Sequence, residues 1–322
     1  MEKSPVSVYF LGSGQLAIPV LRALRESPKV ALTGVGTQPD KPSGRRRRPQ
    51  PTAIGRFAAD GGMAVDKPVS VNSPSFLARV VECCPEIVVV VAFGQILGAE
   101  LLQLPSHGCL NVHASLLPAY RGASPIAAAI RDGQAETGVS FMRMDRGLDT
   151  GPVYRAFALS LGARETAGEL EARLGELAAA RIEEILWQVV REGLSAKPQD
   201  DRNASYASRL DKSAGKLDWS RPAFELDRCI RAYQPWPRAT VVLPVEGKGA
   251  RRLQIVRAEA LARPVGEAPG TVERVGREGF EIACGEGAIR VLELIPEGSR
   301  PMSAADFLRG NRLREGAQAM VS

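Results

Sequence analysis

Five consecutive β-branched residues, Ile87–Val91 (IVVVV), constrain the fold more than any other part of this sequence. A strand with one face in water alternates apolar and polar residues, whereas a strand that is apolar on both faces must be covered on both sides. Such strands occur in parallel sheets whose two faces are packed with helices. The run therefore predicts an α/β domain with a central, mostly parallel sheet.

Other segments in the first 192 residues fit the same architecture. The patterns of apolar residues predict strands at Val6–Leu11, Val30–Val35, Cys109–His113 and Gly138–Met144. They predict helices at Gln15–Arg25, Phe76–Cys84, Pro125–Arg131 and Ala167–Arg191. Because strands alternate with helices, we expect a doubly wound, Rossmann-like sheet. Residues 38–51 combine proline, glycine and a run of arginines, which predicts an exposed loop.

The pattern changes after the helix that ends near residue 191. Residues 193–206 are polar and contain glycine and proline, as a linker would. Short strand-like runs then follow, separated by glycine-rich turns: Thr240–Val245, Arg251–Ala258, Thr271–Val275, Phe280–Ala283 and Ile289–Ile295. They predict a small C-terminal β-barrel of the OB-like, oligonucleotide-binding type. We therefore expect an α/β domain at residues 1–192, a linker at 193–206 and the barrel at 207–322.

Composition argues against several classes of protein. The chain has five cysteines and two histidines but no C-x-x-C pair, so we expect no metal site. The odd number of cysteines and the lack of a signal peptide suggest reduced thiols in a cytoplasmic protein. The longest apolar stretch, Ile87–Phe93, is about a third of a membrane span, so we expect no membrane segment. The formal net charge of +6 leans toward an anionic partner without requiring one.

The first candidate ligand motif is Gly12–Ala17 (GSGQLA), which follows a predicted strand and opens a predicted helix. It fits the G-x-G-x-x-A pattern of dinucleotide sites, with Asp40 as the carboxylate that would bind a ribose. Glycine is also required in tight strand-to-helix turns for purely conformational reasons. Because Asp40 lies in a proline-flanked loop and not at the end of a strand, we favour the tight turn over a dinucleotide site.

The second candidate consists of Asn111, His113 and Asp149. Asn111 and His113 are two residues apart on a predicted strand, so both side chains leave the same face, which meets the ligand crevice near the strand's carboxyl end. An amide N–H can bond a developing oxyanion, and an imidazole can move a proton. Asp149 lies in a glycine-flanked loop, where it could fix the tautomer of His113 or position a water. Taken alone, each motif is more often an ordinary strand-end histidine or a turn.

Together these segments resemble the folate-dependent formyltransferases. The resemblance rests on Asn111–Gly122 (NVHASLLPAYRG) and Glu136–Gly151 (ETGVSFMRMDRGLDTG). Further stretches, in order along nearly the whole chain, narrow it to the methionyl-tRNA formyltransferases: Thr37–Arg45 (TQPDKPSGR), Val90–Leu97 (VVAFGQIL), Leu217–Trp219 (LDW) and Arg228–Pro237 (RCIRAYQPWP). The chain departs from the family at Gly12–Ala17, where relatives usually have G-T-P-x-F-A, and this difference bears on the shape of the pocket on that side.

The resemblance implies roles for individual residues. Asn111, His113 and Asp149 match the catalytic residues of the family, in the same order. The co-substrate 10-formyltetrahydrofolate would lie between the loop around Asp149 and two other segments. The candidate folate-binding residues in those segments are Phe93, Gly94, Ile96, Ser115, Leu116, Leu117 and Pro118.

The resemblance also implies a function for the basic loop at residues 38–51. From the residues alone, a run of charges is usually a solvated face. In the family, however, this loop enters the acceptor stem of the tRNA, and Arg45 matches its key arginine. Arginines in such a loop would bind phosphates through paired, salt-dependent contacts. The candidate tRNA-binding residues are Lys41, Arg45, Arg46, Arg47 and Arg48.

The implied activity is transfer of the formyl group of 10-formyltetrahydrofolate to the α-amino group of methionyl initiator tRNA, which gives N-formylmethionyl-tRNA for translation initiation. Asn111 and His113 would hold the formyl oxygen as charge builds, and a water tied to Asp149 would carry the proton from the amine to the folate nitrogen. The alternatives are a formyltransferase for a UDP-amino sugar, one that forms purine precursors, and a nucleic-acid-binding module without catalysis. The basic loop and Gln234–Pro237 favour tRNA. We expect the protein to be a monomer.

Overall fold

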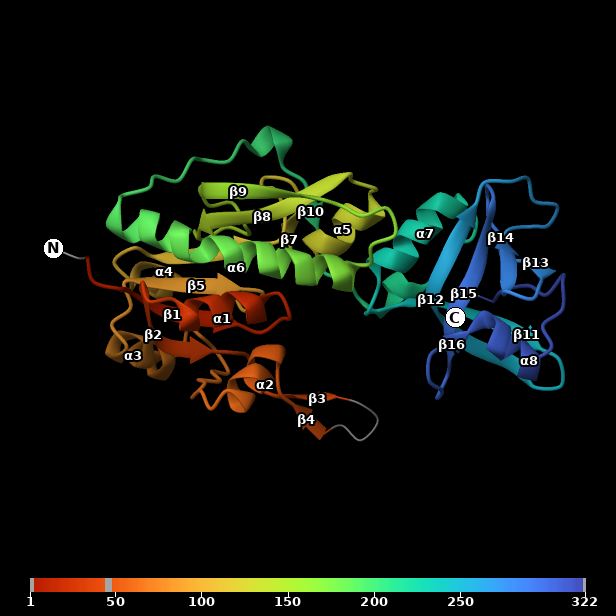
Figure 1. The fold of residues 1–322 in the computed structure, drawn as a ribbon, viewed down its shortest axis with the longest axis horizontal. Helices are drawn as coiled ribbons and strands as arrows, with labels where there is room; N and C mark the ends of the chain where they lie inside the picture. Colours follow the sequence, from red (N-terminus) through yellow and green to blue (C-terminus); the bar gives the residue numbers. More distant parts are fainter. Residues whose placement is uncertain (1–2, 44–47, 321–322) are drawn as a thin grey trace. The chain divides into compact units, whose positions relative to one another are not determined.

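The computed structural model describes residues 3–43 and 48–320 of the chain (Figure 1). The chain divides into two compact units. The first contains Met1–Pro125, Glu136–Ser160 and Glu169–Ser208, and the second contains Ile126–Ala135, Leu161–Gly168 and Arg209–Ser322.

A six-stranded sheet organises the first unit. Its strands are β1 (Val6–Gly12), β2 (Val30–Gly36), β5 (Ile87–Val91), β6 (Cys109–His113), β8 (Glu136–Arg143) and β9 (Val153–Ser160), in the order β2-β1-β5-β6-β8-β9. The first four strands of this order are parallel neighbours, whereas β8 is antiparallel to β6 and β9 is antiparallel to β8. The expectation of a mostly parallel sheet is confirmed.

Helices cover both faces of this sheet. All five residues of β5 are buried, as the unbroken run of β-branched residues predicts. On one face, α3 (Pro74–Glu82) and α4 (Ala99–Gln103) contribute Phe76 and Leu101 to an apolar core that includes Tyr9 of β1 and Val88 of β5. Figure 1 shows α1 (Ala17–Glu26) and the long α6 (Ala167–Arg191) crossing in front of the strands.

The winding of the sheet reverses beside β1. The chain runs from β1 to β2 on one side and then returns to β5 on the other side of β1. At such a switch point, the connections that follow the two central strands leave toward opposite faces and open a crevice at the carboxyl ends of the strands. The turn at Gly12–Ala17 and the loop that follows β5 both lie at this edge.

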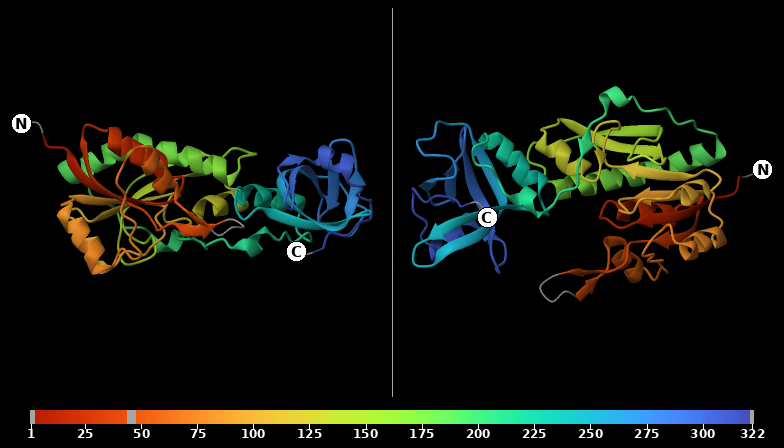
Figure 2. Two further views of the ribbon diagram at one scale, coloured as in Figure 1. Left: turned by 90° about the horizontal axis from the view of Figure 1, so that it is seen from below. Right: turned by 180° about the vertical axis from the view of Figure 1, so that it is seen from behind.

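The arginine-rich stretch at 38–51, expected to form a loop, contains a two-stranded antiparallel ribbon of β3 (Lys41–Ser43) and β4 (Arg48–Gln50) (Figure 2). Pro42 lies opposite Pro49. Proline has no N–H to donate, so this pair fits only a position of the ribbon where no ladder hydrogen bond is needed. The prolines hide the strand signal in the sequence. Helix α2 (Ala53–Asp60) follows the ribbon and begins at Thr52, whose hydroxyl accepts a hydrogen bond from the N–H of Gly55.

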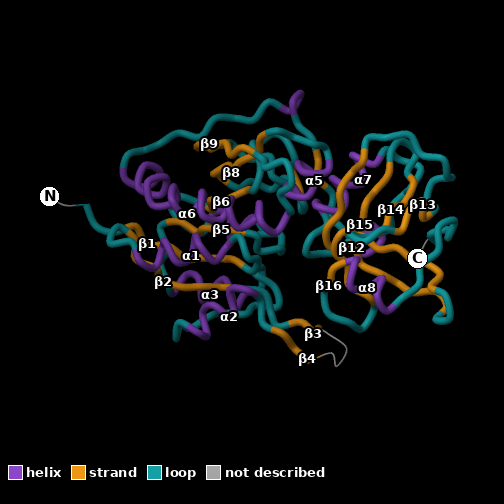
Figure 3. Tube along the Cα trace, turned by 45° about the vertical axis from the view of Figure 1, so that its right-hand side comes forward, coloured by secondary structure: helices purple, strands orange, loops and turns teal. Residues whose placement is uncertain are grey.

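The second unit contains an antiparallel sheet that curls into a small barrel (Figure 3). Its strands are β11 (Ala239–Val245), β12 (Gly249–Leu261), β13 (Val272–Val275), β14 (Phe280–Ala283), β15 (Ala288–Pro296) and β16 (Met302–Ser303). The order is β11-β12-β15-β14-β13, and β16 pairs with β15. The segment 316–320 connects the two edges, because Met320 bridges to Val242 of β11 and the N–H of Val272 bonds Ala317 O at 2.8 Å. The predicted C-terminal barrel is confirmed.

Several shorter elements complete the two units. Helices α5 (Pro125–Arg131), α7 (Ala223–Ala232) and α8 (Ala304–Gly310) accompany the one-turn helices η1 (Asp201–Asn203) and η2 (Lys212–Gly215). In the first unit, β7 (Arg121–Gly122) pairs in parallel with β10 (Tyr206–Ala207). Residues of the polar stretch that leads toward the barrel thus form part of the first unit.

Candidate active site

Asn111 and His113 stand at the carboxyl end of β6, between β5 and β8. Asn111 pairs in register with Val90 and Met142, and His113 pairs with Ser140. The two residues are separated by one position, so their side chains lie on the same face of the sheet. His113 is buried, with 6% of its surface exposed, and Asn111 is half-buried.

Asp149 reaches these two side chains from the loop between β8 and β9. Its Oδ1 accepts a hydrogen bond from Asn111 Nδ2 at 3.4 Å, and its Oδ2 accepts one from the backbone N–H of Gly122 at 2.8 Å. The same Oδ2 lies 3.6 Å from Nδ1 of His113. The structure therefore brings together all three predicted catalytic residues. Asn111 and Asp149, the two that are farthest apart in sequence, are separated by 38 residues.

The second ring nitrogen of His113 faces the backbone. Its Nε2 lies 2.9 Å from the carbonyl oxygen of Tyr120. A carbonyl can only accept, so Nε2 carries the proton that forms this hydrogen bond, and in the neutral ring Nδ1 is the nitrogen with the free lone pair. The tautomer is thus fixed by Tyr120, and Nδ1 is left facing Asp149 at a separation that accommodates a shared water.

The turn Ser115–Pro118 follows His113 directly and is held by side chains. The Leu117–Pro118 peptide bond is cis. The N–H of Leu117 donates to Ser140 Oγ at 3.0 Å, and that hydroxyl donates to Ser115 O at 2.7 Å. Ser115 is fully buried and donates its own hydroxyl to Ala119 O at 2.6 Å. Its side chain therefore shapes the turn, while Leu116, Leu117 and Pro118 are partly exposed along it.

The loop after β5 offers one side chain and a stretch of backbone. Phe93 is buried in the apolar core, Gly94 has a left-handed backbone with φ of 80°, and Ile96 is 83% exposed. The carbonyl oxygen of Phe93 accepts a hydrogen bond from Gln38 Nε2 at 2.7 Å. Of the three predicted folate-binding residues in this loop, only Ile96 therefore presents its side chain. Gln38 is a further side chain that contacts this loop, and the spacing of the motifs does not single it out.

The Gly12–Ala17 turn is occupied by a carboxylate of the protein. Glu171 of α6 accepts a hydrogen bond from the N–H of Leu16 at 3.2 Å, and the N–H of Gly14 bonds Ala92 O at 3.2 Å. Burial raises the pKa of the Glu171 carboxyl above its usual range. A dinucleotide site needs the N–H groups of this turn for a phosphate. The arrangement therefore favours the tight-turn interpretation.

Two of the predicted tRNA-binding residues lie on the β3–β4 ribbon, Lys41 on β3 and Arg48 on β4. Lys41 and Arg48 are exposed, and Lys41 Nζ donates to Gln38 Oε1 at 2.5 Å. Arg45, Arg46 and Arg47 lie outside the described residues. The ribbon thus presents basic side chains from both of its strands.

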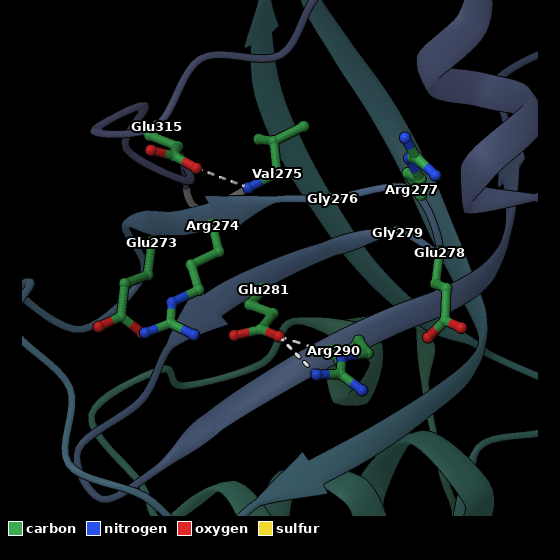
Figure 4. Close-up of a pocket in the computed structure, with 10 residues that line it drawn as sticks. All are labelled: Glu273, Arg274, Val275, Gly276, Arg277, Glu278, Gly279, Glu281, Arg290 and Glu315. Atoms are coloured by element: carbon green, nitrogen blue, oxygen red, sulfur yellow. Dashed lines mark hydrogen bonds and ion pairs between the residues drawn. The ribbon is translucent and has the colours of Figure 1, made fainter.

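A cavity of about 460 Å³ lies on the β13–β14 face of the second unit (Figure 4). Its charged lining residues are Glu273, Arg274, Arg277, Glu278, Glu281, Arg290 and Glu315. Glu281 accepts a hydrogen bond from Arg290 at 2.8 Å, and Glu315 accepts one from the N–H of Val275 at 3.0 Å. Within the lining, Arg290 and Glu281 form an ion pair, and no predicted catalytic residue lines the cavity.

The described part of the chain lacks two features of other functional classes. Within residues 3–43 and 48–320, no group of three or more His, Cys, Asp or Glu side chains is arranged to hold a metal ion. None of the helices described is both long enough and apolar enough to cross a membrane.

Comparison with known proteins finds formyltransferase models that match two successive parts of the chain. Residues 6–186 match the model "Formyl transferase", and residues 209–312 match "Formyl transferase, C-terminal domain". The chain is 41% identical over 315 residues to a methionyl-tRNA formyltransferase of Myxococcus xanthus, with 98% of each protein covered. It is 42% identical over 307 residues to the protein of that name in Xanthomonas euvesicatoria, covering 95% of this chain and 97% of the relative.

Solved structures share the fold at low identity. HypX from Aquifex aeolicus in complex with tetrahydrofolic acid superposes with a TM-score of 0.63 at 16% identity, over 94% of this chain and 46% of HypX. The chain thus spans about half the length of that protein. An N-formyltransferase from Helicobacter canadensis, in complex with folinic acid and dTDP-3-aminofucose, superposes with a TM-score of 0.60 at 17% identity, over 89% of this chain and 99% of that one.

Proposed function

Because this chain belongs to the methionyl-tRNA formyltransferases, we propose that it transfers a formyl group from 10-formyltetrahydrofolate to the α-amino group of methionyl initiator tRNA. The observation that carries the proposal is the convergence of Asn111, His113 and Asp149 at the end of β6. The chemistry is an attack by a neutral amine on the formyl carbon. It needs a group that holds the formyl oxygen and a route that moves one proton from the incoming amine to the departing folate nitrogen.

Asn111 is suited to hold the formyl oxygen. Its amide has two N–H groups, and Asp149 accepts only one of them, at 3.4 Å. The other can bond the oxygen as negative charge develops there, which is the interaction that lowers the barrier in acyl transfer. Because the amide is also held by Asp149, it needs little reorganisation when the charge appears.

His113 and Asp149 are suited to move the proton. Nε2 of the imidazole is engaged by the Tyr120 carbonyl, so Nδ1 is the nitrogen that acts in the reaction. It faces Asp149 across 3.6 Å, where a water can bridge the two groups and relay the proton. When Nδ1 is protonated as well, the imidazolium can donate to the formyl oxygen while the carboxylate of Asp149 balances its charge.

The co-substrate is expected at the switch point of the sheet, where open α/β sheets form a crevice. We propose that the folate lies along the turn Ser115–Pro118, the backbone at Phe93–Gly94 and the exposed side chain of Ile96. Support comes from HypX, which shares this fold and was solved in complex with tetrahydrofolic acid. Holding both reactants in place can by itself lower a barrier by about 7–11 kcal/mol in well-oriented systems.

The second substrate carries phosphates, and the protein offers exposed basic groups. We propose that the β3–β4 ribbon binds the tRNA acceptor stem through Lys41, Arg48 and the intervening arginines, and that residues 207–322 add further tRNA contacts. Contacts of this kind release counterions and therefore weaken as salt rises. The reaction uses folate as a co-substrate, and we assign no metal to it.

One assay distinguishes formylation of tRNA from the alternative, formylation of a UDP-amino sugar. The protein is supplied with 10-formyltetrahydrofolate and, in separate reactions, with charged initiator tRNA, charged elongator tRNA and a UDP-amino sugar. We expect the formyl group on the initiator methionyl-tRNA. Efficient formylation of the sugar with no transfer to tRNA would contradict the proposal and support the alternative.

A further inference from the structure

One amide links the Asp149 loop to the segment that leads toward the barrel. Gln199 Nε2 donates to the backbone carbonyl oxygens of Asp149 and Gly151, at 2.8 and 2.7 Å. Its Oε1 accepts two hydrogen bonds from Arg121, from Nε at 3.0 Å and from Nη2 at 2.8 Å. Gln199 lies 50 residues after Asp149 and has no role in the proposed chemistry, yet it bonds the main chain at both Asp149 and Gly151.

The orientation of this amide follows from its neighbours. Carbonyl oxygens only accept hydrogen bonds and a guanidinium only donates them, so the two ends of the Gln199 side chain cannot exchange places. Arg121 is buried, with 2% of its side chain exposed, and its charge is balanced by Asp201 at 2.7 Å. A buried guanidinium must keep its partners. Arg121 therefore holds the oxygen end of Gln199 and directs its N–H groups toward the loop.

The loop needs such support because of its backbone. Asp149 has φ of 54°, in the left-handed region that side-chain-bearing residues seldom occupy. A backbone conformation of this kind persists only where the surroundings fix it. The Gly122 N–H holds the carboxylate of Asp149, and Gln199 holds the main chain. The direction in which the carboxylate faces His113 thus depends on the two carbonyl contacts.

The same stretch of chain supports the histidine side of the pair. Tyr120, whose carbonyl oxygen fixes the tautomer of His113, is also left-handed, with φ of 58°. Its N–H donates to Ser205 Oγ at 2.8 Å, and the N–H of Arg121 donates to Ser205 O at 2.8 Å. Both groups that flank His113 are therefore held by residues 199–205, a part of the chain that the composition marks only as polar.

We infer that Gln199 is a positioning residue whose two N–H groups hold Asp149 in the orientation that the proton transfer requires. The inference rests on the proposed function of the same site. Two substitutions separate positioning from stabilisation of Arg121. Gln199→Glu keeps an acceptor for Arg121 but loses the donors to both carbonyls, whereas Gln199→Met loses both sets of contacts at a similar volume. Asp201→Asn, the control, alters the other partner of Arg121 and touches neither carbonyl.

The measurements are kcat and KM for both substrates, the melting temperature, and hydrogen exchange of peptides that contain Gly122. Displacements of about 1 Å in a catalytic group can cost ~10²-fold in rate. We expect both Gln199 variants to lose about 10- to 100-fold in kcat with KM changed less than about threefold, and to exchange the Gly122 amide faster than wild type. Asp201→Asn should keep kcat within about twofold of wild type.

Each outcome decides the question. If Gln199 only stabilises Arg121, Gln199→Glu should turn over like the wild-type protein, and that result overturns the inference. A kcat loss in Asp201→Asn as large as that in Gln199→Glu overturns it too. Should Gln199→Met unfold, the Glu variant decides alone. A wild-type protein that formylates no methionyl-tRNA would instead refute the proposed function, and the exchange of the Gly122 amide would still test whether Gln199 holds the loop.

Discussion

Nδ1 of His113 lies 3.6 Å from Oδ2 of Asp149, too far for a strong direct hydrogen bond and near enough for one shared water. Both side chains are proposed to act in the transition state and not in binding. We therefore expect His113→Ala and Asp149→Asn each to lower turnover by at least about 10²-fold while folate affinity changes little. Single-turnover rates at saturating folate measure the effect.

The control for this prediction is the only other histidine of the chain. His107 donates its backbone N–H to Glu86 O and contributes no side chain to the site. His107→Ala should keep the wild-type rate. A near-wild-type rate in His113→Ala or Asp149→Asn would remove that residue from the proposed mechanism.

Gly122 is expected to tolerate no side chain. Its φ is 112°, and an added Cβ would lie 2.7 Å from the carbonyl oxygen of Ala207. Because its N–H also binds the Asp149 carboxylate, Gly122→Ala should lower both stability, by about 1–3 kcal/mol, and turnover. Thermal unfolding and kcat are the measurements. Gly62→Ala is the matched control, since Gly62 has φ of 65° but nothing within 4 Å of the added atom. Equal turnover in the two variants would contradict the role of Gly122.

The pair of Glu86 and Arg191 predicts a pH dependence of stability. Hydrogen bonds from Arg191 at 2.6 and 2.8 Å lower the pKa of the Glu86 carboxyl from 4.5 to about 2. A carboxyl whose pKa is depressed by folding stabilises the protein above its unfolded pKa, and this contribution is lost as the pH falls through the folded value. The stabilisation should therefore decline between about pH 5 and pH 2.

Glu86→Gln should be less stable than wild type at neutral pH, and the difference should shrink as the pH falls through that window. Denaturant unfolding at a series of pH values measures it. Glu82→Gln is the control. The Glu82 side chain is 70% exposed, and its ion pair with Arg79 is long, at 3.7 Å. A gap between the Glu86 variant and wild type that stays constant with pH would show that the ion pair is not its source.

The four arginines at positions 45–48 are expected to act in two ways. Each phosphate contact contributes about −0.7 to −0.9 to the slope of log affinity against log salt. Replacing Arg46, Arg47 and Arg48 with Ser should flatten that slope by about one to three units and weaken all tRNAs alike. Arg45→Ser should instead lower formylation of the initiator tRNA by roughly 10²-fold, about 2.7 kcal/mol, and leave folate binding unchanged.

Filter binding of tRNA at several salt concentrations, with Arg25→Ser as an exposed control on α1, tests the first effect. Formylation rates at fixed ionic strength test the second. An unchanged salt slope in the triple variant, together with an unchanged rate in Arg45→Ser, would mean that tRNA is bound elsewhere.

Patterns that are local in sequence predicted the parts of the fold and site that depend on neighbouring residues. The run at Ile87–Val91 specifies a strand buried on both faces, and the spacing of Asn111 and His113 places two side chains on one face. Asp149 and the catalytic roles of the three residues came from the resemblance to the folate-dependent formyltransferases, because each motif alone is more often a turn or an ordinary strand-end histidine. The two local inferences need only the period of a strand.

What the sequence does not reveal depends on contacts between distant residues and on backbone conformation. Gln199 meets Asp149 across 50 residues, and Ser205 meets Tyr120 across 85. No periodicity records such pairs, and a backbone carbonyl such as that of Tyr120 leaves no trace in the residue type. The antiparallel course of β8 and β9 was hidden for a related reason, because strand direction is set by the connection and not by the strand's own residues.

The closure of the barrel by residues 316–320 has a consequence for synthesis. The main chain of β11 gains its bridge at Val242 only when Met320 is present, and on β13 the outer N–H and C=O of Val272 bond Ala317 and Gly316. On the ribosome, the six earlier strands therefore emerge with two open edges, and an exposed edge is a template for pairing with other chains. The second unit completes its ladder only after residue 320 has left the exit tunnel, whereas all residues of the first unit have been translated by Ser208.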